Sequence, residues 1–406
     1  MQSDRETLTE ARPVTPSRLQ AIDAFRGLIM IVMALDHVRD FFHRSGFSPE
    51  DLARTTPVLF FTRWITHFCA PGFAFMAGMG AFLWWSRRQR SRADLTRYLL
   101  TRGLWLLLLE VTVMRLAFNF SFSLQYPVLL LVFWSLGGSM IALALLVQLP
   151  VRVLAALSIA IIALHNFLDP VTAAQFGAAA PLWNGLHQPG AFPVAGMFVV
   201  VGYPLLPWIG TMAGGFCFGR IYLPAAERRR SVLIRTGLAC TVAFVALRWL
   251  NLYGNPLPWA VQRSGVFTLL SFLNCTKYPP SLDFLLMTLG PALLILAWFD
   301  RLRFGANNPL MVFGRVPFFF FVVHFFAIHA LAVVMALLRY GNAAWRFAWS
   351  PLPSMGGDAK LFPPDFGYSL GQTYCIWILL VVALYPLCRW FGNVKARRKD
   401  WWLSYL

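Results

Sequence analysis

Many ionisable residues lie in the first apolar segment of the chain. Side chains of this kind could transfer protons inside a membrane. The segment "RLQAIDAFRGLIMIVMALDHVRDFF" covers residues 18–42. Past its first residue it carries Asp23, Arg26, Asp36, His37, Arg39 and Asp40. A histidine beside a carboxylate is the usual arrangement of a general base, because the carboxylate orients the ring and stabilises its protonated form. The segment therefore predicts a catalytic His37 served by Asp36 or Asp40, and helical spacing permits either.

On a helix, four of these residues form one stripe. Asp23, Arg26, His37 and Asp40 follow one another through Met30 and Met33 at steps of three or four residues. Arg26 and His37 are about 16 Å apart along the axis, so Asp23 and Arg26 are expected at the cytoplasmic edge and His37 in the outer half. Ionisable groups are costly against lipid, so the stripe must face protein or water. The stripe is interpreted as a functional site, with a buried network that only orients helices as the alternative.

Five further ionisable residues are candidates for the same site. Arg63 and His67 lie four residues apart in "FFTRWITHFCAPGFAFMAGMG", on one helical face. Arg63, His67 or Arg315 could stabilise an oxyanion that develops during a reaction. Lys277, beside a Pro-Pro turn, could meet an anionic substrate group or extend to the membrane surface. His324, in "FGRVPFFFFVVHFFAIH", is either a substrate contact or a hydrogen-bonded core histidine.

The composition is that of a membrane protein. The chain has 406 residues, of which 58% are hydrophobic and 13% charged, whereas about a quarter of the residues are charged in soluble domains. The net charge of +18 falls in short bursts between apolar runs, which indicates topology signals and argues against nucleic-acid binding. The six cysteines are scattered without C-x-x-C spacing, so neither a disulfide framework nor a metal site is expected.

Ten apolar runs predict an all-α polytopic membrane protein with about ten transmembrane helices in a single bundle. The runs are 25–42, 58–86, 98–118, 127–147, 151–168, 194–222, 231–251, 281–299, 309–339 and 369–391. Gly314 and Pro317 predict a kink in the ninth run, or a short piece followed by a span. Arginines and lysines concentrate in alternate connections, which places both termini in the cytoplasm.

The chain is expected to form one membrane domain between two short tails. A disordered cytoplasmic tail is predicted for residues 1–17, the transmembrane domain for 18–392 and a basic cytoplasmic tail for 393–406. No P-loop, G-x-S-x-G, H-E-x-x-H or Rossmann fingerprint is present. A homodimer is one option for the oligomeric state, which the sequence does not decide.

Several of these stretches together resemble one protein family. "RLQAIDAFRGLIMIVMALDH" is similar to the opening of the transmembrane acyltransferase superfamily, whose R-x(10)-H signature would be Arg26 and His37. "RWITHFCAPGFAFMAG", "SFLNCTKYPPSLDFLLMTLGP" and "GRVPFFFFVVHFFAIH" resemble one branch of it. That branch comprises bacterial membrane proteins similar to the catalytic domain of heparan-alpha-glucosaminide N-acetyltransferase. The resemblance runs from about residue 18 to residue 406.

The resemblance implies an integral membrane acyltransferase of the bacterial inner membrane. Such an enzyme would move an acyl group, usually acetyl, from cytoplasmic acyl-CoA to an amine or hydroxyl of an extracytoplasmic sugar or glycan. The superfamily pattern implies His37 as the catalytic residue, general base or acyl carrier, while the animal lysosomal enzymes would point to a loop histidine, here His43. Coenzyme A phosphates could be held by arginines such as Arg26, Arg102, Arg220 and Arg303.

Two other functions are compatible with the same residues. Buried Asp, His and Arg would also serve a proton-coupled secondary transporter or flippase, although no inverted repeat is visible. A non-catalytic scaffold is the third hypothesis, and it predicts a solidly packed stripe with no cytoplasmic opening. The sequence therefore favours an acyltransferase and leaves its acceptor and acyl length open.

Overall fold

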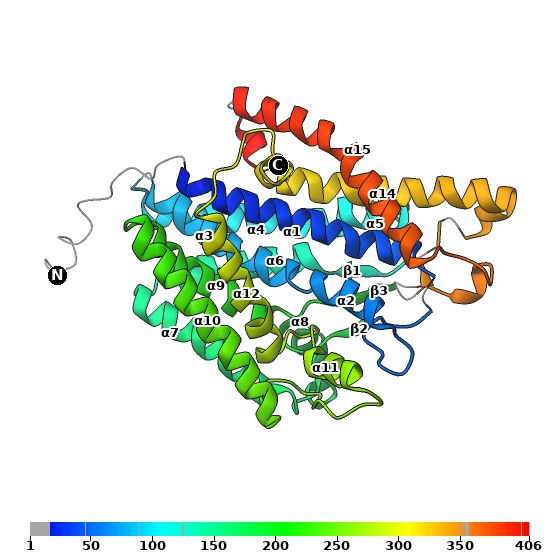
Figure 1. The fold of residues 1–406 in the computed structure, drawn as a ribbon, viewed down its shortest axis with the longest axis horizontal. Coiled ribbons are helices and arrows are strands. Elements are labelled where there is room, and N and C mark those ends of the chain that lie inside the picture. Colours follow the sequence, from blue (N-terminus) through cyan, green and yellow to red (C-terminus); the bar gives the residue numbers. More distant parts are fainter. Residues whose placement is uncertain are drawn as a thin grey trace, which may run out of the picture.

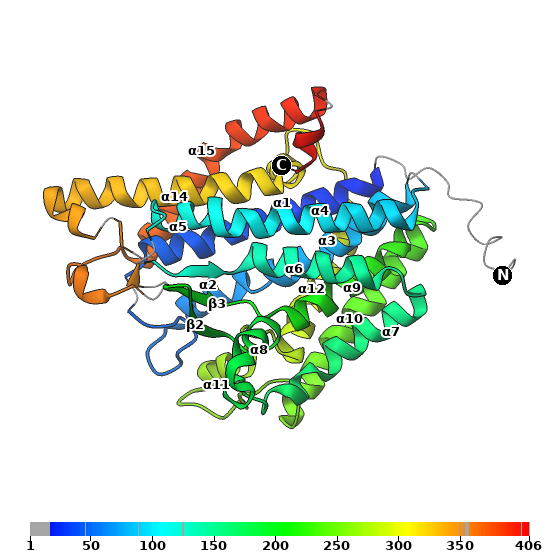
Figure 2. The same ribbon diagram turned by 180° about the vertical axis from the view of Figure 1, so that it is seen from behind.

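The computed structural model describes residues 17–44, 46–87, 89–123, 126–347, 349–350, 352–353, 357–398 and 400–405. Its long helices form one bundle, with the strands and most short helices gathered toward one end (Figures 1 and 2). The predicted tail at 1–17 lies outside the described residues except for Ser17, where the first helix begins. The last long helix continues to Arg397, past the expected start of the C-terminal tail at residue 393.

Each of the ten apolar runs contains at least one helix. The helices of these runs are α1 (Ser17–Phe42), α2 (Pro57–Thr66), α3 (Cys69–Ser86), α4 (Arg92–Leu109), α5 (Arg115–Asn119), α6 (Val132–Leu146), α7 (Val151–Leu164), α9 (Leu205–Phe218), α10 (Ala226–Leu250), α12 (Leu282–Phe299), α13 (Pro309–Arg315), α14 (Pro317–Tyr340) and α15 (Leu370–Arg397). Two short helices, α8 (Ala180–Leu186) and α11 (Gly265–Leu273), lie in the long connections.

The helical, multi-pass character that the sequence predicts is confirmed. Within the described residues, six stretches are long and apolar enough to cross a membrane. They are 57–86, 151–168, 226–250, 282–299, 317–346 and 370–397. Of the other four runs, the first forms the charge-rich α1, the third is divided between α4 and α5, and the fourth and sixth form α6 and α9, which have 15 and 14 residues. The number ten and the cytoplasmic placement of the termini stay predictions.

Three of the runs are interrupted, and two of the interruptions lie next to a proline. Pro71, in the first turn of α3, has no N–H to donate to the carbonyl of His67. The helix is interrupted at His67 and Phe68, between α2 and α3. Val316, which precedes Pro317, has φ −131° and ψ 46°, outside the helical region. It divides α13 from α14, which confirms the interruption predicted for the ninth run. A π-helical turn at Glu110–Met114 separates α4 from α5.

A small sheet was not expected from the apolar runs. Its strands are β1 (Val128–Leu130), β2 (Gly190–Val194) and β3 (Met197–Val201). β3 is central, parallel to β1 with Val128 opposite Val199 and antiparallel to β2 with Gly190 opposite Val201. β1 and β3 lie at the beginning of the fourth and sixth apolar runs. By hydropathy alone, these short valine-containing strands cannot be distinguished from parts of a transmembrane helix. The bundle therefore remains helical, with a minor sheet at one end.

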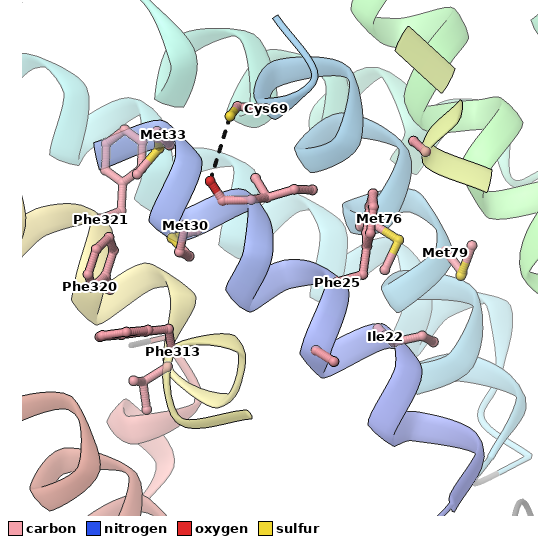
Figure 3. Close-up of a cluster of buried hydrophobic side chains, with 14 of the residues drawn as sticks. Ile22, Phe25, Met30, Met33, Cys69, Met76, Met79, Phe313, Phe320 and Phe321 are labelled. Atoms are coloured by element: carbon pink, nitrogen blue, oxygen red, sulfur yellow. Dashed lines mark hydrogen bonds between the residues drawn. The ribbon is translucent and has the colours of Figure 1, made fainter. Parts of the chain in front are cut away.

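Helix α1 lies between the other helices that form the site. It contacts α2, α3, α12, α13, α14 and α15. Phe313, Phe320 and Phe321 lie on one side of it, and Met76 and Met79 on the other (Figure 3). The contact with α13 depends on glycine, because a Cβ on Gly314 would lie 1.7 Å from the carbonyl oxygen of Asp23. This close approach holds the end of α13 against α1 beside Asp23.

The bundle has two chemically distinct ends. The start of α1, the turn between α3 and α4, and the end of α15 lie together at one end, which we call the basic end (Figures 1 and 2). The connections 43–56 and 341–369 and the sheet lie at the opposite end, which we call the loop end. The ionisable stripe of α1 runs from the first end toward the second.

Candidate functional site

A network of paired charges surrounds Asp36 near the loop end. Asp36 on α1 accepts hydrogen bonds from Nη1 of Arg63 on α2, at 2.8 and 2.6 Å. Thr66 donates to the same carboxylate at 2.9 Å, and Arg39 forms an ion pair with it at 2.8 Å. Arg39 also pairs with Asp40. The network joins α1 to the last turn of α2, just before this helix ends at His67.

Glu50 brings the connection between α1 and α2 into this network. Its Oε1 accepts a hydrogen bond from Nε of Arg63 at 3.1 Å and lies 2.9 Å from Nε2 of His67. Burial raises the pKa of Glu50, but Arg63 and the hydrogen bond with His67 outweigh burial and hold this pKa well below its usual value. His67 is therefore paired with an ionised carboxylate that the sequence analysis had not singled out.

The carboxylate of Asp36, one of the two partners expected for His37, binds other side chains. Both oxygens of Asp36 are used by Arg63, Arg39 and Thr66, and the hydrogen bonds among the described residues include none from His37 to Asp36. A guanidinium offers several donors in one plane, and carboxylates pair with it in preference to an imidazole. Asp36 thus joins α1 to α2, and the carboxylate–histidine pair within this network is Glu50 with His67.

His37 lies instead against α14. Its ring centre is 4.2 Å from that of Phe325 and 5.3 Å from that of His324. Nδ1 of His324 lies 3.0 Å from the carbonyl oxygen of Phe320, which can only accept, so Nδ1 carries the proton. Nε2 of His324 then keeps its lone pair, and it is buried without a hydrogen-bond partner among the described residues. His324 is accordingly a hydrogen-bonded buried histidine beside His37, and its contact with a substrate stays a prediction.

Lys277 and His43 occupy different places around this site. Lys277, in the connection before α12, is buried and interacts electrostatically with both Asp36 and His37. The sequence could not have placed it there, since it is about 240 residues away in the chain. His43 follows the end of α1 and pairs along the backbone with Tyr368, at the loop end. His43 is about 9 Å beyond His37 along the axis of α1.

A large basic cavity opens at the other end of the stripe. Its volume is about 1310 Å³, and α1, α3, α4, α6, α13, α14 and α15 contribute to its wall. The cations that line it are Arg26, Arg87, Arg90, Arg97, Arg102, Arg315 and Lys395, against the carboxylates of Asp23 and Asp94. Asp23 pairs with Arg26 at 3.6 Å, as the sequence suggests. We call this space the basic cavity.

The basic cavity reaches from charged residues to apolar ones close to His37. Its deeper lining includes Met30, Phe133 and Phe321. Phe321 is also a ring neighbour of His37, with centres 6.5 Å apart. Figure 3 shows Phe321 of α14 and Met33 in one buried cluster, and Met33 lies one turn before His37 on α1. His37 thus lies between the apolar depth of the cavity and the paired-charge network.

The structure separates the predicted residues into two groups. Asp36, Asp40, Arg63, His67, Lys277 and His324 gather around His37 near the loop end, and Asp23, Arg26 and Arg315 line the basic cavity. Arg315 is exposed and lines the basic cavity, and its expected role beside an oxyanion stays a prediction. Of the arginines suggested for coenzyme A, Arg26 and Arg102 line the cavity, and Arg220 and Arg303 are not among the described lining residues.

The family of the chain follows from a comparison of its sequence. The profile of the family described as heparan-alpha-glucosaminide N-acetyltransferase, catalytic, matches residues 18–254, more than half of the chain. The chain belongs to this family. No protein of curated function matches it significantly. The match confirms the resemblance seen in the sequence and places the chain in a transmembrane family of the N-acetyltransferase type.

The family match covers part of each group of residues. It includes α1 to α4, and with them His37, Glu50, Arg63 and His67. Lys277, Arg315 and His324 lie beyond residue 254, so only the fold joins them to the matched part. No group of three or more His, Cys, Asp or Glu side chains in the described part of the chain is arranged to hold a metal ion.

Proposed function

We propose that this family member transfers an acyl group, acetyl by preference, from cytoplasmic acyl-CoA to an amine or hydroxyl of an extracytoplasmic sugar or glycan. The observation that carries the proposal is the basic cavity, whose apolar depth ends at a ring neighbour of His37. Seven cations against two carboxylates suit a ligand with several phosphate charges. In this assignment the basic end faces the cytoplasm of a bacterial inner membrane.

His37 is the residue best placed to act between donor and acceptor. The acceptor nitrogen or oxygen attacks the thioester carbonyl, the C–S bond breaks, and the proton of the acceptor passes through His37 to the leaving thiolate. In the two-step variant, His37 carries the acyl group before the acceptor attacks. Lys277 supplies positive charge beside the reacting carbonyl, where a developing oxyanion needs it.

The paired-charge network supports the acceptor side of the same site. Side chains of Asp40 and Glu50 are about a quarter exposed, at 25% and 26%, so this side is in contact with solvent at the loop end. Asp36 and Arg63 are buried and mutually paired, which keeps both charged groups satisfied. An acceptor that enters from this end would meet His37 from the side opposite the donor.

The experiment uses purified full-length protein in lipid nanodiscs with labelled acetyl-CoA and amino-sugar acceptors. We expect CoA release that depends on an acceptor, and we expect His37→Ala to abolish it while acetyl-CoA binding persists, because the cavity lining is unchanged. His43→Ala is the matched control and should retain transfer. Mass spectrometry of the protein after donor addition distinguishes an acyl-histidine from direct transfer.

Two results would contradict the proposal. Full transfer by His37→Ala would remove His37 from the reaction. Uptake of a solute into proteoliposomes in the absence of any acyl-CoA, with no CoA release under any condition, would favour a proton-coupled transporter.

A further inference from the structure

Two aromatic rings and two guanidinium groups form a stacked group in the wall of the basic cavity. The guanidinium carbon of Arg90 lies 3.6 Å from the centre of the Trp84 ring. Trp84 stacks on Tyr98 with ring centres 4.0 Å apart and planes at 23°. The guanidinium of Arg102 lies 4.5 Å from the centre of Tyr98. All four side chains line the cavity, so the stack belongs to its wall.

The two rings are held more firmly than the guanidinium that covers Trp84. Trp84 lies on α3 and Tyr98 on α4, and their contact joins the two helices. Arg90 lies in the turn between these helices, directly after Gln89, whose φ is +46°. A side chain on such a turn can move without shifting a helix. Arg90 can therefore leave the face of Trp84 while the ring stays in place.

The charge around the stacked group favours an anionic ligand. Asp94, one of the two carboxylates in the lining, caps α4 through Ser91 at 2.8 and 3.1 Å. The other, Asp23, pairs with Arg26. Cations therefore outnumber carboxylates in the described lining, and this excess of positive charge would attract a polyanion. A ring face next to such a surplus of cations is the combination that proteins use for nucleotides, because the base stacks while the phosphates pair with arginine.

We propose that Trp84 is the stacking subsite for the purine base of a multiply phosphorylated nucleotide, with Arg90 turning from the ring to the phosphates. The proposal rests on the proposed function and deepens it, since this nucleotide is the part of the acyl-CoA donor that lies farthest from the thioester. A phospholipid headgroup has phosphate but no flat ring, so it would use the cations and leave Trp84 unused. The stacked group is therefore the feature that selects a nucleotide.

The test measures binding of three probes to full-length protein in nanodiscs. The probes are adenosine 3′,5′-bisphosphate, inorganic pyrophosphate and acetyl-phosphopantetheine, which is a thioester without the nucleoside. We expect Trp84→Leu to weaken nucleotide binding about tenfold or more and to leave the other two probes unchanged. Tyr98→Phe keeps the lower ring and is the matched control, with binding like that of the unaltered protein.

Specific outcomes would overturn the inference. One is nucleotide binding no tighter than pyrophosphate binding in the unaltered protein, and another is an equal loss of all three probes in Trp84→Leu. If Trp84→Leu does not fold, Arg90→Ala replaces it: the ratio of nucleotide to pyrophosphate affinity should rise, because the base no longer displaces a guanidinium. A fall in that ratio would contradict the inference.

The same experiment separates this inference from the proposed function. Acetyl transfer from acetyl-phosphopantetheine without any preference for the nucleotide would keep the acyltransferase and remove the purine subsite. Nucleotide binding that Trp84→Leu abolishes, in a protein that transfers no acetyl group, would keep the subsite and remove the acyltransferase.

Discussion

Asp36 illustrates what a residue type can and cannot reveal. Its position next to His37 predicts a catalytic pair, yet its carboxylate is held by Arg63 and Arg39. The two arginines provide stronger, charge-assisted hydrogen bonds than an imidazole would. Arg63 comes from a different helix, so its proximity to Asp36 depends on how α1 and α2 pack. Within this network the histidine with a carboxylate partner is His67, which obtains it from Glu50 in a polar loop without a recognisable motif.

Glu50 leads to a prediction of pH dependence. Its pKa in the folded protein lies well below the usual 4.5, so the unfolded chain takes up this proton first as the pH falls. The stabilisation is therefore complete above about pH 5 and is lost as the pH falls through the folded-state pKa. Thermal unfolding of the unaltered protein and of Glu50→Gln, followed from pH 7 to pH 3, should show a gap that closes on acidification. A constant gap over this range would contradict the prediction.

At the scale of elements, the interruptions of the helices place the site residues. Pro71 ends the continuity of α2 and α3 beside His67, and Pro317 separates α13 from α14. The second of these breaks was predictable from Gly314 and Pro317, because proline restricts the residue before it. The small sheet was not, since short β-branched stretches match a membrane span in hydropathy as well as they match a strand.

The approach of α13 to α1 gives an element-scale prediction. Gly314→Ala would put a methyl group 1.7 Å from the Asp23 carbonyl oxygen, which neither helix can accept without moving. We expect a loss of about 1–3 kcal/mol or more in stability, together with weaker donor binding, because Arg315 and Asp23 line the basic cavity. Gly371→Ala in α15 is the control, since no atom lies within 4 Å of the added methyl group. Equal melting temperatures for both variants would refute the prediction.

At the scale of the whole molecule, the two ends carry different chemistry. Cations outnumber carboxylates among the described residues that line the basic cavity, whereas the network near the loop end is close to neutral because Arg39 and Arg63 pair with Asp36, Asp40 and Glu50. His37 lies between them. This polarity agrees with the predicted orientation, in which arginine-rich connections stay in the cytoplasm.

Orientation can be tested by labelling single cysteines in a background without native cysteine. Gly46 at the loop end and Arg301 in the connection between α12 and α13 are both exposed. We expect Gly46→Cys to react with a membrane-impermeant maleimide in intact spheroplasts, and Arg301→Cys to react only after permeabilisation. The reverse pattern would invert the topology and place the basic cavity outside the cytoplasm.

The sequence alone determined the membrane class, the family resemblance and the ionisable stripe of α1, because hydropathy and helical periodicity are local properties. It also indicated most of the residues that gather at the two ends. Only the tertiary structure decided which of them meet: Glu50 with His67, His324 with His37, and Trp84 with Arg90. Such contacts depend on how separate helices and loops pack, and no spacing within one segment encodes that packing.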